Sequence, residues 1–160
     1  MNTMLMTRRS LVAGLTASAL LAHSRASRAQ DLPKIVVIKD PTCGCCTGWV
    51  NHLRQAGFTA DVIETSEINR VKVRLGVPND LASCHTAEIG GYVIEGHVPA
   101  DAIKRLLTEK PTGKGLAVAG MPMGSPGMEM EGMAPETYEV VLFGPSGRTT
   151  FARYEGARLL

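Results

Sequence analysis

The sequence predicts an α/β fold in which a mixed β-sheet carries helices on its faces. Short β-branched runs alternate with segments of helical periodicity through the first half of the chain, and strands separated by helices usually pair in parallel. Residues 137–156 instead contain two apolar runs around a Gly-Pro-Ser-Gly turn, which is typical of an antiparallel hairpin. These observations together predict a sheet that is parallel in its first part and ends in an antiparallel hairpin.

The first four predicted elements alternate between strand and helix. Residues 34–40 (KIVVIKD) form a β-branched run and are predicted as a buried strand. Residues 46–57 place apolar side chains at helical spacing and end in glycine, which predicts a helix. Residues 58–65 alternate as a second strand, and residues 66–76 follow as a second helix in which Ser66 is a candidate N-cap.

The second helix is expected to bury Ile68, Val71 and Leu75, which lie on one of its faces. Residues 83–99 are glycine-rich and carry one short predicted strand around residues 91–94. A third helix is predicted within residues 99–111, with Pro99 near its first turn and Pro111 beyond its end. This part of the chain is an inserted β-α segment. The resulting order is that of a thioredoxin-like fold with additional elements.

Residues 1–29 have the features of a secretory signal peptide. Arg8 and Arg9 precede an apolar run at residues 11–22, and Ser27-Arg28-Ala29 is a candidate cleavage site. The paired arginines favour the twin-arginine route, although an ordinary signal with two chance arginines remains an alternative. The apolar run is too short to span a membrane, so we expect an exported, periplasmic protein with no stable membrane insertion after signal removal.

The mature metal-binding domain is predicted at residues 30–160. The signal peptide carries four arginines and no acid, so its removal leaves thirteen Lys and Arg against fifteen Asp and Glu, a net charge of −2. This balance does not suggest a nucleic-acid partner. A domain of this length buries a core without needing disulfides, and the bacterial periplasm is an oxidising compartment.

Three of the four cysteines in the chain lie in one turn. Cys43, Cys45 and Cys46 follow the first predicted strand and open the first predicted helix, where the helix dipole favours thiolates. Cys43 and Cys46 have the C-x-x-C spacing of a reversible redox disulfide, which makes them candidate catalytic residues. Cys45 does not belong to that motif, and three neighbouring thiols suit a soft metal ion.

Cys84, His85 and His97 are further candidate ligands. Cys84 lies far along the chain, but a compact domain allows it to reach the cysteine turn, and His85 follows it directly. His97 precedes the third predicted helix. Each histidine alone is a weak signal. His52 lies on the first predicted helix and is expected at the surface.

Five methionines form a second cluster within predicted loop residues 115–136. Many glycines and prolines interrupt this segment, so the methionines cannot line a regular apolar face. Thioether sulfur is a soft ligand that suits Cu(I). The cluster is therefore a candidate source of Cu(I) ligands, and its members are Met121, Met123, Met128, Met130 and Met133. Pro122 is a candidate cis-proline facing the cysteines.

Three functions explain part or all of these features. Two structural disulfides explain the even number of cysteines but not their crowding. A thiol-disulfide oxidoreductase explains Cys43 and Cys46 but neither Cys45 nor the methionines. A Cu(I)-thiolate site on a thioredoxin-like scaffold explains both clusters with one chemistry, although silver and other soft metals also suit such ligands.

The chain resembles the CopG-like family of exported copper-resistance proteins, long catalogued as a domain of unknown function. The matching segments are PTCGCCTGWVNHL, LASCHTAEIGGYVIEGHVPADAIKRLL and GLAVAGMPMGSPGMEM, which together extend over about residues 34–155. Met130 and Met133 lie beyond the core motif.

The resemblance implies a thioredoxin-like fold that binds Cu(I) through cysteine sulfur, in a site able to hold a multinuclear cluster. It implies Cys43, Cys45, Cys46 and Cys84 as thiolate ligands, with His85 or His97 as an accessory group and Met121 or Met123 nearby. It also implies a redox role in copper resistance that interconverts Cu(I) and Cu(II), and other periplasmic copper-handling proteins as partners.

Overall fold

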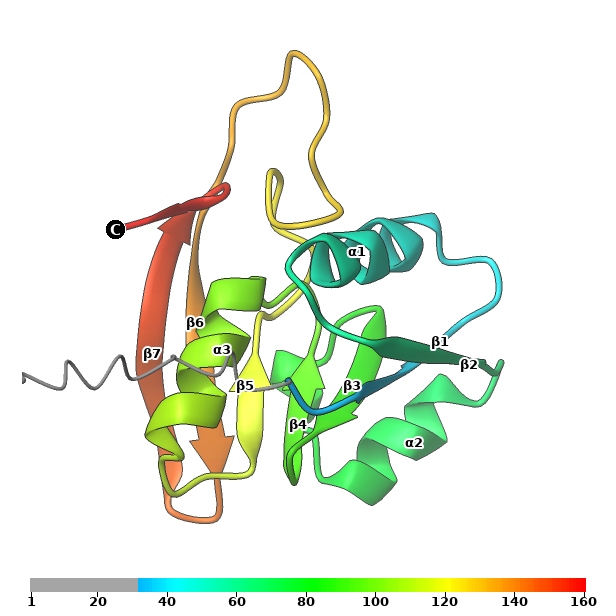
Figure 1. Ribbon diagram of the computed structural model, residues 1–160, viewed down its shortest axis with the longest axis vertical. Coiled ribbons are helices and arrows are strands. Elements are labelled where there is room, and N and C mark those ends of the chain that lie inside the picture. Colours follow the sequence, from blue (N-terminus) through cyan, green and yellow to red (C-terminus); the bar gives the residue numbers. More distant parts are fainter. Residues whose placement is uncertain (1–31) are drawn as a thin grey trace, which may run out of the picture. The chain divides into compact units, whose positions relative to one another are not determined.

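The structure, a computed structural model, describes residues 32–160, and in this part of the chain it has one eight-stranded sheet and three α-helices (Figure 1). The strand order is β2-β1-β3-β4-β5-β6-β7-β8. β1 pairs with β2 in parallel, and so does β4 with β5, whereas the other neighbouring strands are antiparallel. Among these residues, no helix has the length and apolar character needed to cross a bilayer.

The elements follow one another in chain order with short connections, except for the long segment that joins β5 to β6. They are β1 (Ile35–Lys39), α1 (Gly44–Gln55), β2 (Ala60–Glu64), α2 (Ile68–Leu75), the 3-10 turn η1 (Asn79–Leu81), β3 (His85–Ile89), β4 (Tyr92–Glu95), α3 (Ala100–Glu109), β5 (Gly115–Ala117), β6 (Thr137–Gly144), β7 (Gly147–Glu155) and β8 (Arg158–Leu159).

The two faces of the sheet are covered by different helices. The larger core packs α1 and α3 on one face, through Trp49, Leu53 and Ile103. The smaller core lies on the opposite face, where Val93 of β4 meets Val77, which follows α2. Successive strand residues point to opposite faces, so each strand of the central sheet contributes side chains to both layers.

The predicted mixed α/β sheet with a C-terminal hairpin is confirmed. β1 and β2 are parallel, as the intervening helix predicts, and β6 and β7 form the hairpin. The inserted segment has two strands, β3 and β4, where the sequence predicted one. The sequence did not predict this hairpin, because β3 begins with a histidine, which does not look like a buried strand residue, and the two glycines of the β3–β4 turn made the segment look like a loop.

The buried face of α2 differs from the prediction. Ile68, Val71 and Leu75 are only half-buried, and the residue of α2 that is buried is Lys72. Ser66 makes no cap, because α2 begins after Glu67 and has no side-chain capping bond. An amphipathic pattern ranks apolar residues as the buried ones, so it cannot predict a lysine that is buried with a carboxylate partner.

His52 is not a free surface residue but caps the start of α3. Its Nε2 atom accepts a hydrogen bond of 3.1 Å from the backbone N–H of Ala100, the first residue of α3, whose N-cap residue is a proline without a capping side chain. Burial lowers the pKa of the His52 imidazole below its usual 6.5, although nearby carboxylates of Glu129 and Asp101 oppose this shift. The neutral ring is therefore the form that suits the folded protein.

We expect the His52 cap to make folding stability depend on pH. Because the pKa of His52 is lower in the folded chain, its stabilisation is complete above about pH 6.5, the usual pKa in an unfolded chain, and declines as the pH falls toward the lowered value. Replacing His52 by Ala should cost about 1 kcal/mol of unfolding free energy at pH 8 and less at pH 5. Urea unfolding of both proteins at the two pH values measures this difference, and a difference that is independent of pH would contradict the prediction.

Candidate metal centre

The cysteine turn joins β1 to α1 and is fixed by Asp40. The Asp40 carboxylate accepts hydrogen bonds from the backbone N–H of Thr42, at 2.8 Å, and from its hydroxyl, at 2.6 Å. These bonds lower the pKa of the Asp40 carboxyl. Cys43 then takes the N-cap position of α1 without any side-chain capping bond, so the first turn of the helix presents its unpaired N–H groups beside the cysteines.

The four cysteines converge on one point. Cys43 and Cys46 form a disulfide with a Cα–Cα distance of 5.4 Å, while Cys45 and Cys84 are free thiols. The Sγ atom of Cys45 lies 3.5 Å from that of Cys43 and 3.6 Å from that of Cys84. All four sulfur atoms lie within 4.8 Å of one another. Cys45 is thus the central sulfur of the group.

His97 faces Cys84 with a fixed tautomer. Its Nδ1–H donates a hydrogen bond of 2.8 Å to the carbonyl oxygen of Pro126, and its Nε2 lies 3.1 Å from the Sγ of Cys84. A carbonyl oxygen only accepts, so the proton is on Nδ1 and the Nε2 lone pair points at the thiol. Histidines that bind metals are usually held in this way, by a hydrogen bond from the other ring nitrogen.

The protonation states of Cys84 and His97 agree with this geometry. Burial, reinforced by contact with Cys45 and opposed by the hydroxyl of Ser83, raises the pKa of the Cys84 thiol to about 11. Burial also lowers the pKa of His97. The metal-free pair is therefore a neutral thiol that donates to a neutral imidazole, and a metal ion must displace the thiol proton in order to bind.

His85 is the buried polar group without a partner in the described part of the chain. Neither of its ring nitrogens has a hydrogen bond, although the side chain is fully buried. Its ring lies 4.3 Å from the Trp49 ring and 4.9 Å from the His97 ring, centroid to centroid. Burial lowers the pKa of His85 far below its usual range, and the neighbouring His97 and Lys72 act in the same direction.

His85 therefore stays neutral, and one of its ring nitrogens, one ring nitrogen of His97 and the Sγ of Cys84 lie within 4.8 Å of one another. A neutral imidazole keeps a lone pair for a metal ion. The residues present thus offer soft sulfur and neutral nitrogen donors, which suit copper.

The methionine loop, which we define as residues 118–136, lies beside α1 (Figure 1), and its Gly127 approaches the backbone of Gly48 and Trp49. A Cβ atom at Gly48 would lie 3.0 Å from the Cα of Gly127. Gly127 has a φ of +87°, and a Cβ there would lie 2.5 Å from the backbone nitrogen of Trp49. Two glycines therefore let the loop backbone touch the helix backbone next to the cysteine turn.

The candidate methionine ligands occupy different environments within this loop. Met123 is half-buried, whereas Met121 is 54% exposed, and Met130 and Met133 are similarly exposed. The predicted cis-proline is wrong, because the described residues contain no cis peptide bond and Pro122 is trans. The proline whose backbone faces the centre is Pro126, through its bond with His97.

We expect Gly48→Ala to displace the methionine loop. Alanine suits a helix better than glycine, but the new methyl group would push Gly127 away and weaken the neighbouring Pro126–His97 hydrogen bond. The cost should be about 1–3 kcal/mol of unfolding free energy. Gly44→Ala is the matched control, because a Cβ at Gly44 would meet no atom within 4 Å. Equal stability of the two variants in urea would contradict this prediction.

Several residues around the centre were not predicted from the sequence. The carbonyl of Pro126, the Trp49 ring and the buried pair Lys72–Glu95 all support ligand candidates. A carbonyl or a buried ion pair leaves no sequence signal. The indole N–H of Trp49 donates to the carbonyl of Val98 at 2.9 Å, which ties α1 to the segment that carries His97.

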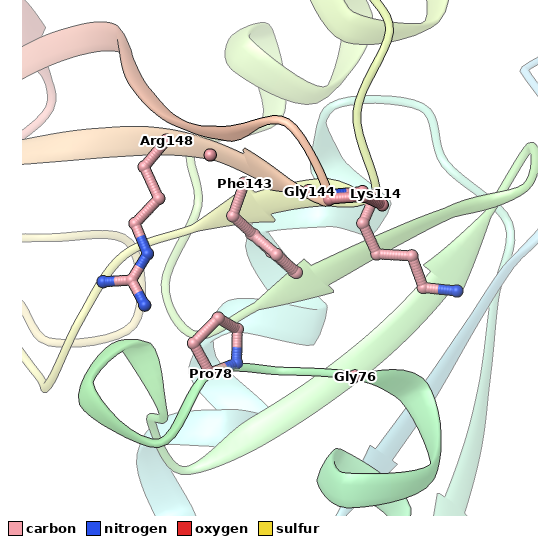
Figure 2. Close-up of a pocket in the computed structure, with 8 residues that line it drawn as sticks. Gly76, Pro78, Lys114, Phe143, Gly144 and Arg148 are labelled. Atoms are coloured by element: carbon pink, nitrogen blue, oxygen red, sulfur yellow. The ribbon is translucent and has the colours of Figure 1, made fainter.

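A separate hollow of about 390 Å³ lies between the hairpin turn and the segment after α2 (Figure 2). Lys114, Phe143 and Arg148 line it together with prolines and glycines. Its lining contains no sulfur or imidazole group, so it is separate from the candidate metal ligands.

Comparison with known proteins identifies the family of this chain. Residues 81–128 match the family described as "Protein of unknown function, DUF411", and no curated protein sequence matches the chain significantly. Two solved structures described as copper resistance protein CopG, forms 1 and 2, share 44% and 42% of their sequence with this chain, each with a TM-score of 0.72. The matches cover 78% and 77% of this chain and 99% and 98% of those chains. The resemblance inferred from the sequence motifs is confirmed, and the chain belongs to the CopG-like family.

Proposed function

We propose that this protein binds Cu(I) through its four cysteines and serves copper resistance. The observation that carries the proposal is the convergence of all four sulfur atoms within 4.8 Å. Crowded thiolates and a neutral imidazole are soft ligands, which favour Cu(I). The copper-resistance description of the two CopG structures supports copper over other soft metals.

In this proposal Cys43, Cys45, Cys46 and Cys84 are the thiolate ligands in the reduced protein. His97 supplies Nε2 beside Cys84, and the unpartnered His85 supplies a further nitrogen. Met121 and Met123 act in the loop that adjoins the turn, where they cover the centre or transfer the ion. The number of thiolates makes room for more than one copper ion.

The Cys43–Cys46 pair gives the centre a redox function. When the two thiols form their disulfide, they lose two electrons and two protons. Two Cu(II) ions, each taking one of those electrons, become two Cu(I) ions, and the protons pass to the solvent. Cys45 and Cys84 remain as thiols, so the oxidised protein keeps two sulfur ligands. In the reverse reaction two Cu(I) ions each give one electron to the disulfide and become Cu(II), and two protons from the solvent complete the two thiols.

A thiol-disulfide oxidoreductase is the second candidate. The disulfide at the N-terminus of α1 supports it, because this position favours a thiolate at Cys43. That function needs neither Cys45 nor Cys84, so removing these two cysteines distinguishes it from copper binding.

We place the function in the periplasm. Residues 1–29, which lie outside the described residues, would be the signal peptide, and the twin-arginine route is our first choice for export. The working protein is then the domain of residues 30–160, and its partners are copper ions and other periplasmic copper-handling proteins. Fractionation of cells that express the full chain tests this placement. A protein found in the cytoplasmic fraction with residues 1–29 still attached would overturn it.

The test of copper binding is an anaerobic titration of the reduced domain with Cu(I) against a competing chelator. We expect the protein to take Cu(I) from the chelator, and bound copper to protect the thiols when air is admitted. Failure to compete, with quick formation of a single disulfide in air, would instead favour the oxidoreductase. Adding Cu(II) to the reduced protein tests the redox step, which should yield one disulfide for every two Cu(I) formed.

A further inference from the structure

Lys72 and Glu95 form a buried ion pair on the α2 face of the sheet, opposite the candidate metal centre. The side chain of Glu95 is fully buried and that of Lys72 is 7% exposed, and the Nζ of Lys72 lies 2.5 Å from a carboxylate oxygen of Glu95. The same carboxylate accepts hydrogen bonds of 2.6 Å from the backbone N–H of Ser83 and from the hydroxyl of Thr86. Lys72 also donates to the Thr86 hydroxyl, at 2.8 Å.

The residues that bond to Glu95 flank two candidate ligands, Cys84 and His85, in the sequence. Ser83 immediately precedes Cys84, and Thr86 immediately follows His85. Thr86 and Glu95 face each other across the β3–β4 pair. His85 contacts Trp49 on the α1 side of the sheet, so Thr86, the next residue of the strand, points to the α2 side. The ion pair therefore holds this segment from the face opposite to the metal centre.

The network also connects the segment with the methionine loop. The hydroxyl of Ser83 donates to the carbonyl oxygen of Gly120 in that loop. Glu95 lies two residues before His97. One carboxylate thus links the backbone beside Cys84 with the chain that carries His97, and Cys84 and His97 are the pair that meet at 3.1 Å.

A buried ion pair is a costly way to attach a helix. Apolar residues of similar volume usually stabilise a protein equally well, because both charges lose their hydration on burial. Such pairs are better explained where they determine one geometry among several. Here the carboxylate accepts from three donors on two different segments, Lys72 on α2 and both Ser83 and Thr86 around β3, which apolar side chains cannot do.

We propose that Glu95, supported by Lys72, is a positioning residue that holds Ser83–His85 so that Cys84 meets Cys45 and His97. The inference rests on the proposed function for its copper consequence. The position of Cys84 itself is a property of the metal-free protein. The proposal is therefore testable with and without copper.

Two charge-neutral double variants test the proposal. We call the hydrogen bonds from residue 95 to Ser83 and Thr86 the tether. Lys72→Met with Glu95→Gln keeps the tether, because the glutamine oxygen accepts from the backbone N–H of Ser83 and its amide N–H donates to the hydroxyl of Thr86. Lys72→Met with Glu95→Leu removes the tether and leaves no buried charge. Both should fold, as circular dichroism will show, so their difference reports the tether alone.

The copper-free readout is the alkylation of Cys84 by iodoacetamide relative to that of Cys45, mapped by mass spectrometry with the Cys43–Cys46 disulfide intact. We expect the ratio to rise about tenfold in the leucine variant, because the released segment opens locally, and to stay near the wild-type value in the glutamine variant. An unchanged ratio in the leucine variant would overturn the proposal.

The copper readout is a Cu(I) titration of the same proteins with and without Cys84→Ser. Loss of the tether should weaken Cu(I) binding about 10- to 100-fold when Cys84 is present and have no further effect when it is absent. An equal loss of Cu(I) affinity with Cys84 and with Cys84→Ser would show that the whole site had become less ordered, and it would contradict the positioning role. If the wild-type protein binds no Cu(I), the proposed function fails, and the alkylation ratio still decides whether Glu95 positions Cys84.

Discussion

Cys45→Ser should weaken Cu(I) binding by at least about 100-fold while leaving the Cys43–Cys46 disulfide able to form. Removing groups that merely support a metal ligand typically costs 10–100-fold, and Cys45 is the central sulfur, at 3.5 Å from Cys43 and 3.6 Å from Cys84. Without this sulfur atom, no ligand lies between the Sγ of Cys43 in the turn and the Sγ of Cys84. Serine retains the size of the side chain but offers a hard oxygen, which Cu(I) disfavours.

The matched control for Cys45→Ser is Cys46→Ser in the same turn. Under reducing conditions each variant lacks one of the four thiols, but only Cys46→Ser prevents the disulfide. Anaerobic competition titrations give the Cu(I) affinities, and mass spectrometry after alkylation gives the disulfide. Copper binding by Cys45→Ser at the wild-type affinity would exclude the four-sulfur centre and favour the plain oxidoreductase.

Glu95→Leu should destabilise the fold by about 3–5 kcal/mol, because it leaves the Lys72 ammonium buried without its counter-charge. Typical domains have only 5–15 kcal/mol of stability, so this variant should be largely unfolded or close to unfolding at 37 °C. The additional change Lys72→Met should restore most of the loss, since it removes the stranded charge. Urea unfolding of the single and double variants measures both effects.

The rescue distinguishes charge burial from loss of packing. If Glu95→Leu and the double variant were equally unstable, a poor fit of the leucine would explain the loss and the ion pair would not. A single variant as stable as the wild type would mean that water reaches Lys72, contrary to its exposed side-chain fraction of 7%.

The cysteine turn could be predicted because all its signals are local. A β-branched strand, a turn and the helical periodicity around Trp49 and Leu53 fix where Cys43 to Cys46 lie. The approach of Cys84 followed only from the compactness of a small domain, and the sequence left open how His85 and His97 differ. The structure separates them through long-range contacts, a carbonyl partner for His97 and none for His85.

The errors in the predicted fold have two physical origins. The sequence ranks residues by hydrophobicity, but the β3–α2 interface is held by Lys72, Thr86 and Glu95, which are polar. β5 has only three residues and begins with glycine, so it gave no strand pattern. The burial of the backbone at Gly115, where a Cβ would collide with β4, explains why this strand needs glycine.

The strand order has a consequence for how the protein folds. Every neighbouring pair in the sheet except β1–β3 joins strands that are consecutive along the chain. Local pairings close short loops and form quickly, so the β6–β7 hairpin is expected to form early. The candidate ligands, in contrast, come from segments that follow β1 and β4 and from the start of β3. The centre is therefore complete only after β1 and β3, the one non-consecutive pair, have met, and copper capture is expected to follow the slowest step of sheet assembly.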